Sequence, residues 1–269
     1  MSNLPQELVD LVIDKLAESL PFRSREPRYL ISYYSTVSQQ WVQRTQLHHF
    51  KVLRFAHQDH LHKWRKNFTS GFSRYVHELQ LRSVDTLEGF CDYFRDFTEV
   101  KVAEVHYCNF FRSLEDVWPL TSLGSTLVDL EITMDPKAPP LAPEVIARFL
   151  AALPHLRHFH VQNLFTTPPK NPDASLPRIP FFEGENDFEL LFDEGYPDVL
   201  WWVPPTARFG KLALGVSCLV NVDVVNKWIT SSGPSLKWLD LSYDGDLEGA
   251  CFSCSNSTSF SVSPANCVS

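Results

Sequence analysis

The segment Leu127-Val128-Asp129-Leu130-Glu131-Ile132 contains the pattern from which the fold can be predicted. An apolar residue is followed by two variable residues, a second apolar residue, one variable residue and a third apolar residue. The last two apolar positions alternate with polar ones, as in a strand that buries one face. The pattern occurs six times: at Val76-Leu79-Leu81, Phe97-Val100-Val102, Leu127-Leu130-Ile132, Leu156-Phe159-Val161, Phe209-Leu212-Leu214 and Leu236-Leu239-Leu241.

Four of the five intervals between the starts of these patterns are 21 to 30 residues long, which leaves room for one return segment after each strand. Segments 86–95, 143–153 and 222–231 have apolar residues at helical spacing, and Pro143 suits the start of its helix. Strands that alternate with helices predict an α+β to α/β fold with a parallel sheet. An ordinary α/β domain remains the alternative to a true repeat array.

One longer gap, from Leu156 to Phe209, breaks this spacing. Segment 163–208 contains eight prolines and eight acidic residues against three basic ones, yet Phe181-Phe182 and Trp201-Trp202 are too apolar for a free linker. We expect either an insertion that folds partly onto the array, with a short helix near 186–194, or a derailed repeat. The tail, 248–269, is rich in serine and is expected to be disordered.

The residues between the apolar positions of each strand should point to the concave face of such an array. The expected target-binding face consists of Glu78, Gln80, Arg82, Glu99, Lys101, Asp129, Glu131, His158, His160, Lys211, Trp238 and Asp240. Its first three strands have a modest acidic bias, which favours a basic or polar protein segment as the ligand. A simple solvated face is the alternative, and Trp238 is the most distinctive position because exposed aromatic residues anchor interfaces.

The first fifty residues predict a small helical module. Pro5 suits the first position of a helix, and Leu8, Val9, Val12, Ile13 and Leu16 form a broad apolar arc opposite acidic residues. Two further helices are expected at about 28–37 and 38–50. Three short helices bury little surface, so the module requires a neighbour.

This region resembles the F-box, and in particular the F-box-like family expanded in fungi. The resemblance rests on Leu4-Pro5-Gln6-Glu7-Leu8, then Ile13 and Leu16, then Val37-Ser38-Gln39-Gln40-Trp41, then His49-Phe50-Lys51-Val52. It implies docking to a Skp-family adaptor, and through it to a cullin, by Leu4, Pro5, Leu8, Ile13, Leu16, Val37 and Trp41. The six strand patterns resemble the irregular leucine-rich repeats that often follow F-boxes, although the characteristic asparagine after the strand is absent.

The expected organisation is an F-box-like module (3–53), a linker helix (54–75), a leucine-rich-repeat-like solenoid with a parallel sheet (76–247, with the insertion 163–208) and a tail (248–269). The expected function is substrate recruitment within a Skp–cullin–F-box ubiquitin ligase. The alternatives are a repeat-type interaction scaffold with no ubiquitin link, in which the N-terminal helices cap the array, and an enzyme.

The composition narrows the class of partner. A formal net charge of -8 disfavours general binding to nucleic acid, and no run approaches the ~18 apolar residues of a membrane span. The N-terminus does not resemble a signal peptide, and the six cysteines are scattered, so we expect the cytosol or nucleus.

Motifs for catalysis and metal binding are weak. The chain lacks GxGxxG, GxxxxGK[ST], GxSxG and HExxH motifs. Lysines and an arginine adjoin the histidines at 57, 60 and 62; the histidines at 155, 158 and 160 have no nearby cysteine or carboxylate; and Cys251 and Cys254 lack a second pair. We therefore expect no catalytic residues, no cofactor and no metal.

Overall fold

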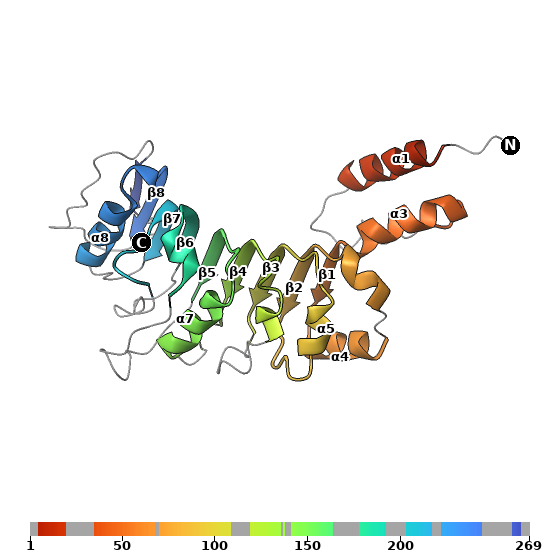
Figure 1. Cartoon of the computed structure of the whole chain (residues 1–269), viewed down its shortest axis with the longest axis horizontal. Coiled ribbons are helices and arrows are strands. Elements are labelled where there is room, and N and C mark those ends of the chain that lie inside the picture. Colours follow the sequence, from red (N-terminus) through yellow and green to blue (C-terminus); the bar gives the residue numbers. More distant parts are fainter. Residues whose placement is uncertain are drawn as a thin grey trace, which may run out of the picture.

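The computed structural model is a mixed α/β fold built on one parallel sheet, as expected (Figure 1). The structure describes residues 5–19, 35–67, 70–108, 119–135, 137, 141–163, 178–191, 203–216, 222–243 and 260–264. Within these residues the sheet has nine strands, and the order of the strands across the sheet is their order in the sequence. Each strand from β2 to β8 therefore pairs with the strand before it and the strand after it, and β1 and β9 are the edges of the described sheet.

The strands are aligned across the sheet, with one shift in register between β6 and β7. Their bounds are β1 Val52–Phe55, β2 Glu78–Arg82, β3 Val102–His106, β4 Asp129–Thr133, β5 His158–Gln162, β6 Asn186–Leu191, β7 Phe209–Val216, β8 Trp238–Tyr243 and β9 Phe260–Pro264. The first aligned row runs through Val52, Glu78, Val102, Asp129, His158, Asp187, Lys211 and Trp238, which follow one another at nearly even intervals along the chain. The chain thus repeats a structural unit of one strand and one return.

The main chain repeats the same hydrogen bonds before several strands and the same backbone conformation after them. Before β2, the N–H groups of His77 and Glu78 both donate to the carbonyl of Lys51, and the same two-to-one arrangement precedes β3, β4 and β5. Directly after β2, β3 and β5, the residues Ser83, Tyr107 and Asn163 have φ of 50°, 53° and 57°. This left-handed backbone turns the chain out of the sheet at the same point in three units.

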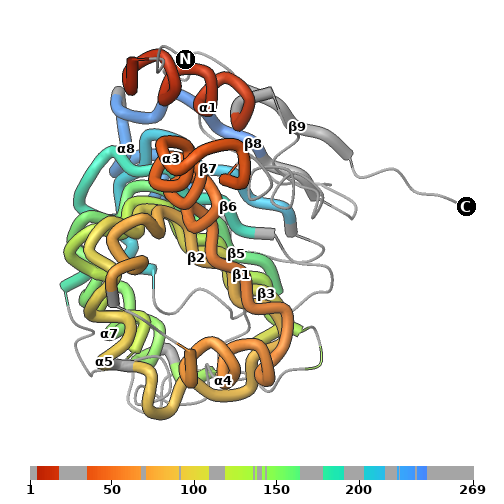
Figure 2. Tube along the Cα trace, turned by 90° about the vertical axis from the view of Figure 1, so that its right-hand side faces the viewer, coloured from red at the N-terminus to blue at the C-terminus, as the bar shows by residue number. Residues whose placement is uncertain are grey.

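The return segments lie on one face of the sheet (Figure 2). They include α4 Gln58–Asn67, η1 Ser70–Tyr75, α5 Cys91–Arg95, α7 Pro143–Ala151, η2 Pro180–Glu183, α8 Val222–Ser232 and η3 Gly233–Ser235. The helices predicted at 143–153 and 222–231 are therefore confirmed as α7 and α8, whereas only the C-terminal half of 86–95 is helical. We call the opposite side of the sheet the open face.

The core lies between the strands and these returns. The inward residues of the strands, such as Leu79, Leu130 and Leu239, are almost completely buried. Phe159, Phe188 and Phe209 come from β5, β6 and β7 and stack in sequence, with ring centroids 5.9 and 5.4 Å apart. Aromatic stacking thus continues the core through the region that was expected to interrupt the array.

Segment 163–208 contains a regular strand. β6 pairs in register with β5 and, after one bulge, with β7, so the helix predicted near 186–194 is wrong. The long gap therefore holds two ordinary units, one from β5 to β6 and one from β6 to β7. The strand was missed because Glu185 occupies the first position of the pattern, where the other units have an apolar residue.

Three other expectations need correction. The inward residues of β3 are Ala103 and Val105, so the pattern at Phe97-Val100-Val102 was placed too early in the sequence. β1 begins before the expected boundary at residue 53, and α4 and η1 form the first return and not a separate linker. In the expected disordered tail, β9 pairs with β8, while 244–259 and 265–269 lie outside the described residues.

Two N-terminal helices stand at the β1 end of the sheet (Figure 1). They are α1 Gln6–Ser19 and α3 Gln39–Phe50. α3 contacts η1 and β1, whereas α1 packs against α3 and projects away from the sheet. The helix expected at 28–37 lies outside the described residues up to residue 34, and residues 35–37 form a turn.

Candidate functional site

The open face carries rows of polar side chains because alternate residues of each strand point away from the core. The middle row runs through Arg54, Gln80, Glu104, Glu131, His160, Glu189, Ala213 and Asp240. The first row, from Val52 to Trp238, contributes Glu78, Asp129 and Asp187. These two rows carry seven carboxylates and only two permanent cations, Arg54 and Lys211, so the open face is acidic.

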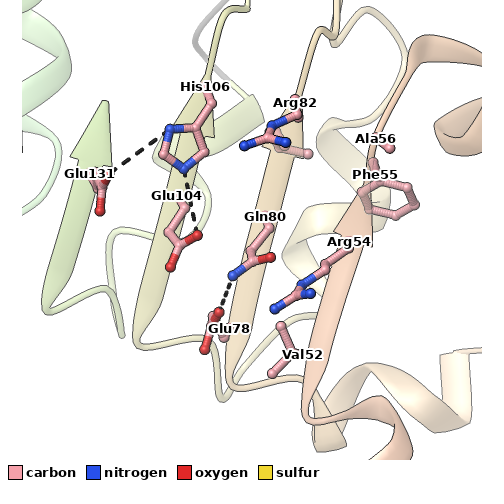
Figure 3. Close-up of a pocket in the computed structure, with 11 residues that line it drawn as sticks. Val52, Arg54, Phe55, Ala56, Glu78, Gln80, Arg82, Glu104, His106 and Glu131 are labelled. Atoms are coloured by element: carbon pink, nitrogen blue, oxygen red, sulfur yellow. Dashed lines mark hydrogen bonds and ion pairs between the residues drawn. The ribbon is translucent and has the colours of Figure 1, made fainter. Parts of the chain in front are cut away.

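A hollow of about 680 Å³ lies over β1 to β4 on this face (Figure 3). Arg54 and Arg82 line it from β1 and β2, while Glu104, His106 and Glu131 line it from β3 and β4. Arg54 and Arg82 thus lie on the β1–β2 side of the hollow and Glu104 and Glu131 on the β3–β4 side, while Glu78 of β2 adds a third carboxylate to the lining. The arrangement is suited to binding charged groups through charge-assisted hydrogen bonds.

Glu104 is the best-connected carboxylate in this hollow. Its pKa is held below the ordinary value chiefly by hydrogen bonding to His106, with smaller contributions from Gln80 and Arg54, and burial opposes the shift. His106 Nε2 lies 3.6 Å from Glu104 Oε2, and His106 Nδ1 lies 3.1 Å from the Thr133 hydroxyl and 3.9 Å from Glu131 Oε1. Glu104 is therefore an anion at neutral pH.

A second acidic position lies beside the hollow. Burial raises the pKa of Asp129; the charge of Glu104 adds to the shift, and His158 and His160 oppose it. The imidazole of His158 also contacts Asp187 on β6, with Nδ1 3.1 Å from Oδ2. The two histidines of β5 thus separate the acidic groups of β4 from those of β6.

Towards β8 the face becomes mixed in charge. Lys211 Nζ lies 3.4 Å from Glu189 Oε2, so this lysine is already paired within the row. Trp238 is next in the first row, and 44% of its surface is exposed. An exposed indole beside a cation offers an apolar contact to a bound chain.

Ten of the twelve residues expected on the target-binding face lie on the open face. They are Glu78, Gln80, Arg82, Asp129, Glu131, His158, His160, Lys211, Trp238 and Asp240. Glu99 and Lys101 do not, because both precede β3. The missed residues are Arg54, Glu104, His106, Asp187 and Glu189; alternation about Leu53-Phe55, Ala103-Val105 and Phe188-Leu190 would have found them.

The N-terminal pair has a different surface. Helix α1 carries two apolar stripes: Val9, Ile13 and Ala17 are buried, whereas 47% of Leu8, 54% of Leu11 and 43% of Val12 remain exposed. Val37, just before α3, is 59% exposed. We call Leu8, Leu11, Val12 and Val37 the apolar edge.

An ion pair joins the two helices on their polar side. Both carboxylate oxygens of Asp14 accept hydrogen bonds from Arg44, at 2.6 Å each, and His48 Nε2 lies 2.8 Å from Asp14 Oδ1. Hydrogen bonding to Arg44 is the largest cause that lowers the Asp14 pKa to about 2; burial opposes the shift and His48 adds to it. The contact between α1 and α3 thus combines an apolar stripe with a charged clamp.

The residues expected to bind the Skp-family adaptor are divided between these surfaces. Pro5, Leu8 and Val37 are exposed, Leu16 and Trp41 are half-buried, and Ile13 is buried between the helices. Leu4 lies outside the described residues. Ile13 therefore supports the pair from inside and does not offer a surface, while Leu11 is an exposed residue that the resemblance did not supply.

Within the described residues, no group of three or more histidine, cysteine or acidic side chains could hold a metal ion, and no helix is long and apolar enough to cross a bilayer. The pair Cys251 and Cys254 lies outside those residues. Cys108 is buried, and burial raises the pKa of its thiol to about 12, which makes it a packing residue and a poor nucleophile.

Comparison with known proteins returned no match: no family model, no curated protein and no solved structure matches the chain. The resemblance to the F-box and to leucine-rich repeats therefore remains a prediction from the residues quoted in the sequence analysis.

Proposed function

We propose that the chain is the target-recruiting adaptor of a Skp–cullin–F-box ubiquitin ligase. In this proposal α1 and α3 belong to an F-box-like module that binds a Skp-family adaptor, and the parallel sheet with its returns is a leucine-rich-repeat-like solenoid that binds the target protein. The chain performs no catalysis itself and works in the cytosol or nucleus. It raises the concentration of the target near the ubiquitin-transfer machinery, as tethering does.

The apolar edge is the observation that carries the proposal. Leu8, Leu11 and Val12 lie at i, i+3 and i+4 on α1 and form one exposed stripe. This stripe is separate from the buried residues that pack α1 against α3. Complete burial of such a side chain contributes about 1.5–3 kcal/mol. Covering these half-exposed residues therefore provides several kcal/mol for docking to a partner helix.

The sheet supports the second half of the proposal. A parallel sheet whose strand order follows the sequence, with one return segment per strand, is the arrangement of a stacked repeat array. Such arrays leave one long face for binding, and here that face carries the polar rows.

Co-purification with a Skp-family adaptor tests the proposal. Wild-type protein should retain the adaptor, and Leu8→Asp/Leu11→Asp should reduce retention at least about tenfold, because each buried aspartate costs more than the apolar contact it removes. Both positions are exposed, so the variant should fold normally. The matched control is Gln40→Asp/Gln43→Asp, which adds the same charge at exposed positions of α3 and should retain the adaptor.

An interaction scaffold with no ubiquitin link is the second candidate. The contact of α3 with η1 and β1 favours it, because these contacts are those of an N-terminal cap. Equal adaptor recovery with wild type and with Leu8→Asp/Leu11→Asp, or no recovery with wild type, would select the scaffold and reject the ligase adaptor.

A further inference from the structure

We propose that the open face binds an extended, positively charged segment of the target, with an arginine or lysine side chain seated between Glu104 and Glu131. The identity of the segment as part of a degradation target rests on the proposed function. The charge preference rests on the sheet alone.

Glu104 and Glu131 bring two carboxylates side by side on the open face. The two residues are directly aligned on β3 and β4, where neighbouring strands lie about 4.8 Å apart. Asp129 lies in the adjacent row of β4, and the charge of Glu104 helps to raise its pKa. Like charges in aligned positions repel each other. A bound cation between β3 and β4 would therefore add to the contacts that His106 already makes with both carboxylates.

The hollow provides the space and the acceptors for that cation. Glu104 and Glu131 line one side of it, and both side chains are about one-third exposed. His106 sits over both of them, and its Nδ1 also contacts Thr133. A guanidinium group is planar and can bind two carboxylates at once, so arginine fits this position better than lysine.

The continuation of the acidic rows argues for an extended chain and against a small cation. Beyond His158 and His160 of β5, β6 presents Asp187 and Glu189 in the same two rows. From the midpoint of β3 and β4 to β6 is about 12 Å, which an extended segment covers in about three to four residues. Basic residues three or four positions apart would therefore meet the β3–β4 and β6 carboxylates in turn, and Trp238 lies further along the same path.

Peptide binding to the full chain tests this preference directly. The probe is a fluorescent peptide with arginines at alternate positions, and its partner peptide has glutamines at those positions. Wild-type protein should bind the arginine peptide more tightly, and binding should weaken as salt rises. Glu104→Gln/Glu131→Gln should weaken binding about fivefold, since each of two exposed ion pairs contributes about 0.5 kcal/mol. Glu88→Gln/Glu144→Gln removes equal charge from the return side and should bind as wild type does.

Charge reversal supplies a second, independent readout. In Glu104→Lys/Glu131→Lys, the two lysines join Arg54 and Arg82 around the hollow, so the preference should shift to a peptide with glutamates at alternate positions. The inference is overturned if wild type and Glu104→Gln/Glu131→Gln bind the arginine peptide equally, or if wild type prefers the acidic peptide or a single-stranded oligonucleotide.

The two proposals fail separately in these assays. The peptide titration contains no Skp-family adaptor, and the adaptor co-purification contains no peptide. Adaptor retention without selective peptide binding rejects the open-face inference and leaves the ligase adaptor standing. Selective peptide binding without adaptor retention rejects the ligase adaptor and keeps the charge preference.

Discussion

Helix α1 and the parallel sheet bury their apolar residues to different extents. In the sheet, the inward side chains of each strand are buried and the open face is polar, with carboxylates from β2 to β6. In α1, Val9 and Ile13 are buried, but Leu8 and Leu11 remain in solvent. The sheet completes its own apolar core, whereas α1 does not.

Under the proposed function, this difference predicts two kinds of partner. An exposed apolar stripe gains free energy mainly by excluding water, so its partner should be apolar and closely packed. A charged face gains selectivity and speed of association, so its partner should be of opposite charge and its binding should depend on salt. The two surfaces can therefore be altered independently.

The largest expected difference between the two regions is in stability. Phe188→Ala removes a fully buried ring between Phe159 and Phe209 and should lower the free energy of unfolding by about 3–5 kcal/mol. Leu8→Ala, at a half-exposed position, should change it by less than about 0.5 kcal/mol. Urea unfolding of the full chain measures both. Similar losses would mean that the apolar edge is part of the core.

A smaller effect concerns the clamp between α1 and α3. Asp14 has a pKa of about 2 in the folded chain against an ordinary value of 3.8, so ionised Asp14 stabilises the fold. That contribution, about 1 kcal/mol once solvent screening is allowed for, is complete above about pH 5 and is lost as the pH falls through about 2. Asp14→Asn should therefore unfold more easily than wild type at neutral pH, and the difference should shrink on acidification.

Glu7→Gln is the control for the clamp, because Glu7 is an exposed carboxylate of the same helix and does not belong to the cluster of Asp14, Arg44 and His48. Its unfolding should follow wild type at each pH. A difference between Asp14→Asn and wild type that stays constant from neutral pH to pH ~2 would show that the ion pair is not the source of the effect.

The smallest effect sharpens the interpretation of the open face. Glu131→Gln removes the charge aligned with Glu104 and should raise the free energy of unfolding by about 0.3 kcal/mol at low salt. The gain should vanish at high salt, and Glu88→Gln should show none. A gain in stability from Glu131→Gln alone would indicate that Glu131 serves binding at a small cost in stability. Destabilisation by Glu131→Gln would mean that the carboxylate serves the fold.

The sequence patterns predicted most of the sheet because leucine or isoleucine alternates clearly with polar residues in β2, β4 and β8. They misplaced β3 because Ala103 is small and only weakly apolar. The pattern was therefore assigned to the more apolar Val100 and Val102. β6 was lost for a related reason, since Glu185 is charged. In each case the neighbouring strands supply the register that the local sequence does not.

Prediction of the candidate site depended on prediction of the strands that carry it. Glu78, Asp129 and Glu131 were placed correctly because their strands were, whereas Glu104 and Glu189 were missed together with β3 and β6. The alignment of Glu104 with Glu131 depends on pairing between two strands that a whole return segment separates in the sequence. No local pattern contains that information.

The paired main-chain bonds before β2 to β5 and the left-handed residues after β2, β3 and β5 have a consequence for how such a protein can change over evolution. Main-chain atoms join one strand to the next, so a gene segment that encodes one strand and its return could be duplicated or lost without redesign of the rest. Each such event would lengthen or shorten the ligand-facing surface by about 4.8 Å. The length of the open face and the identity of the side chains on it could thus evolve as separate traits.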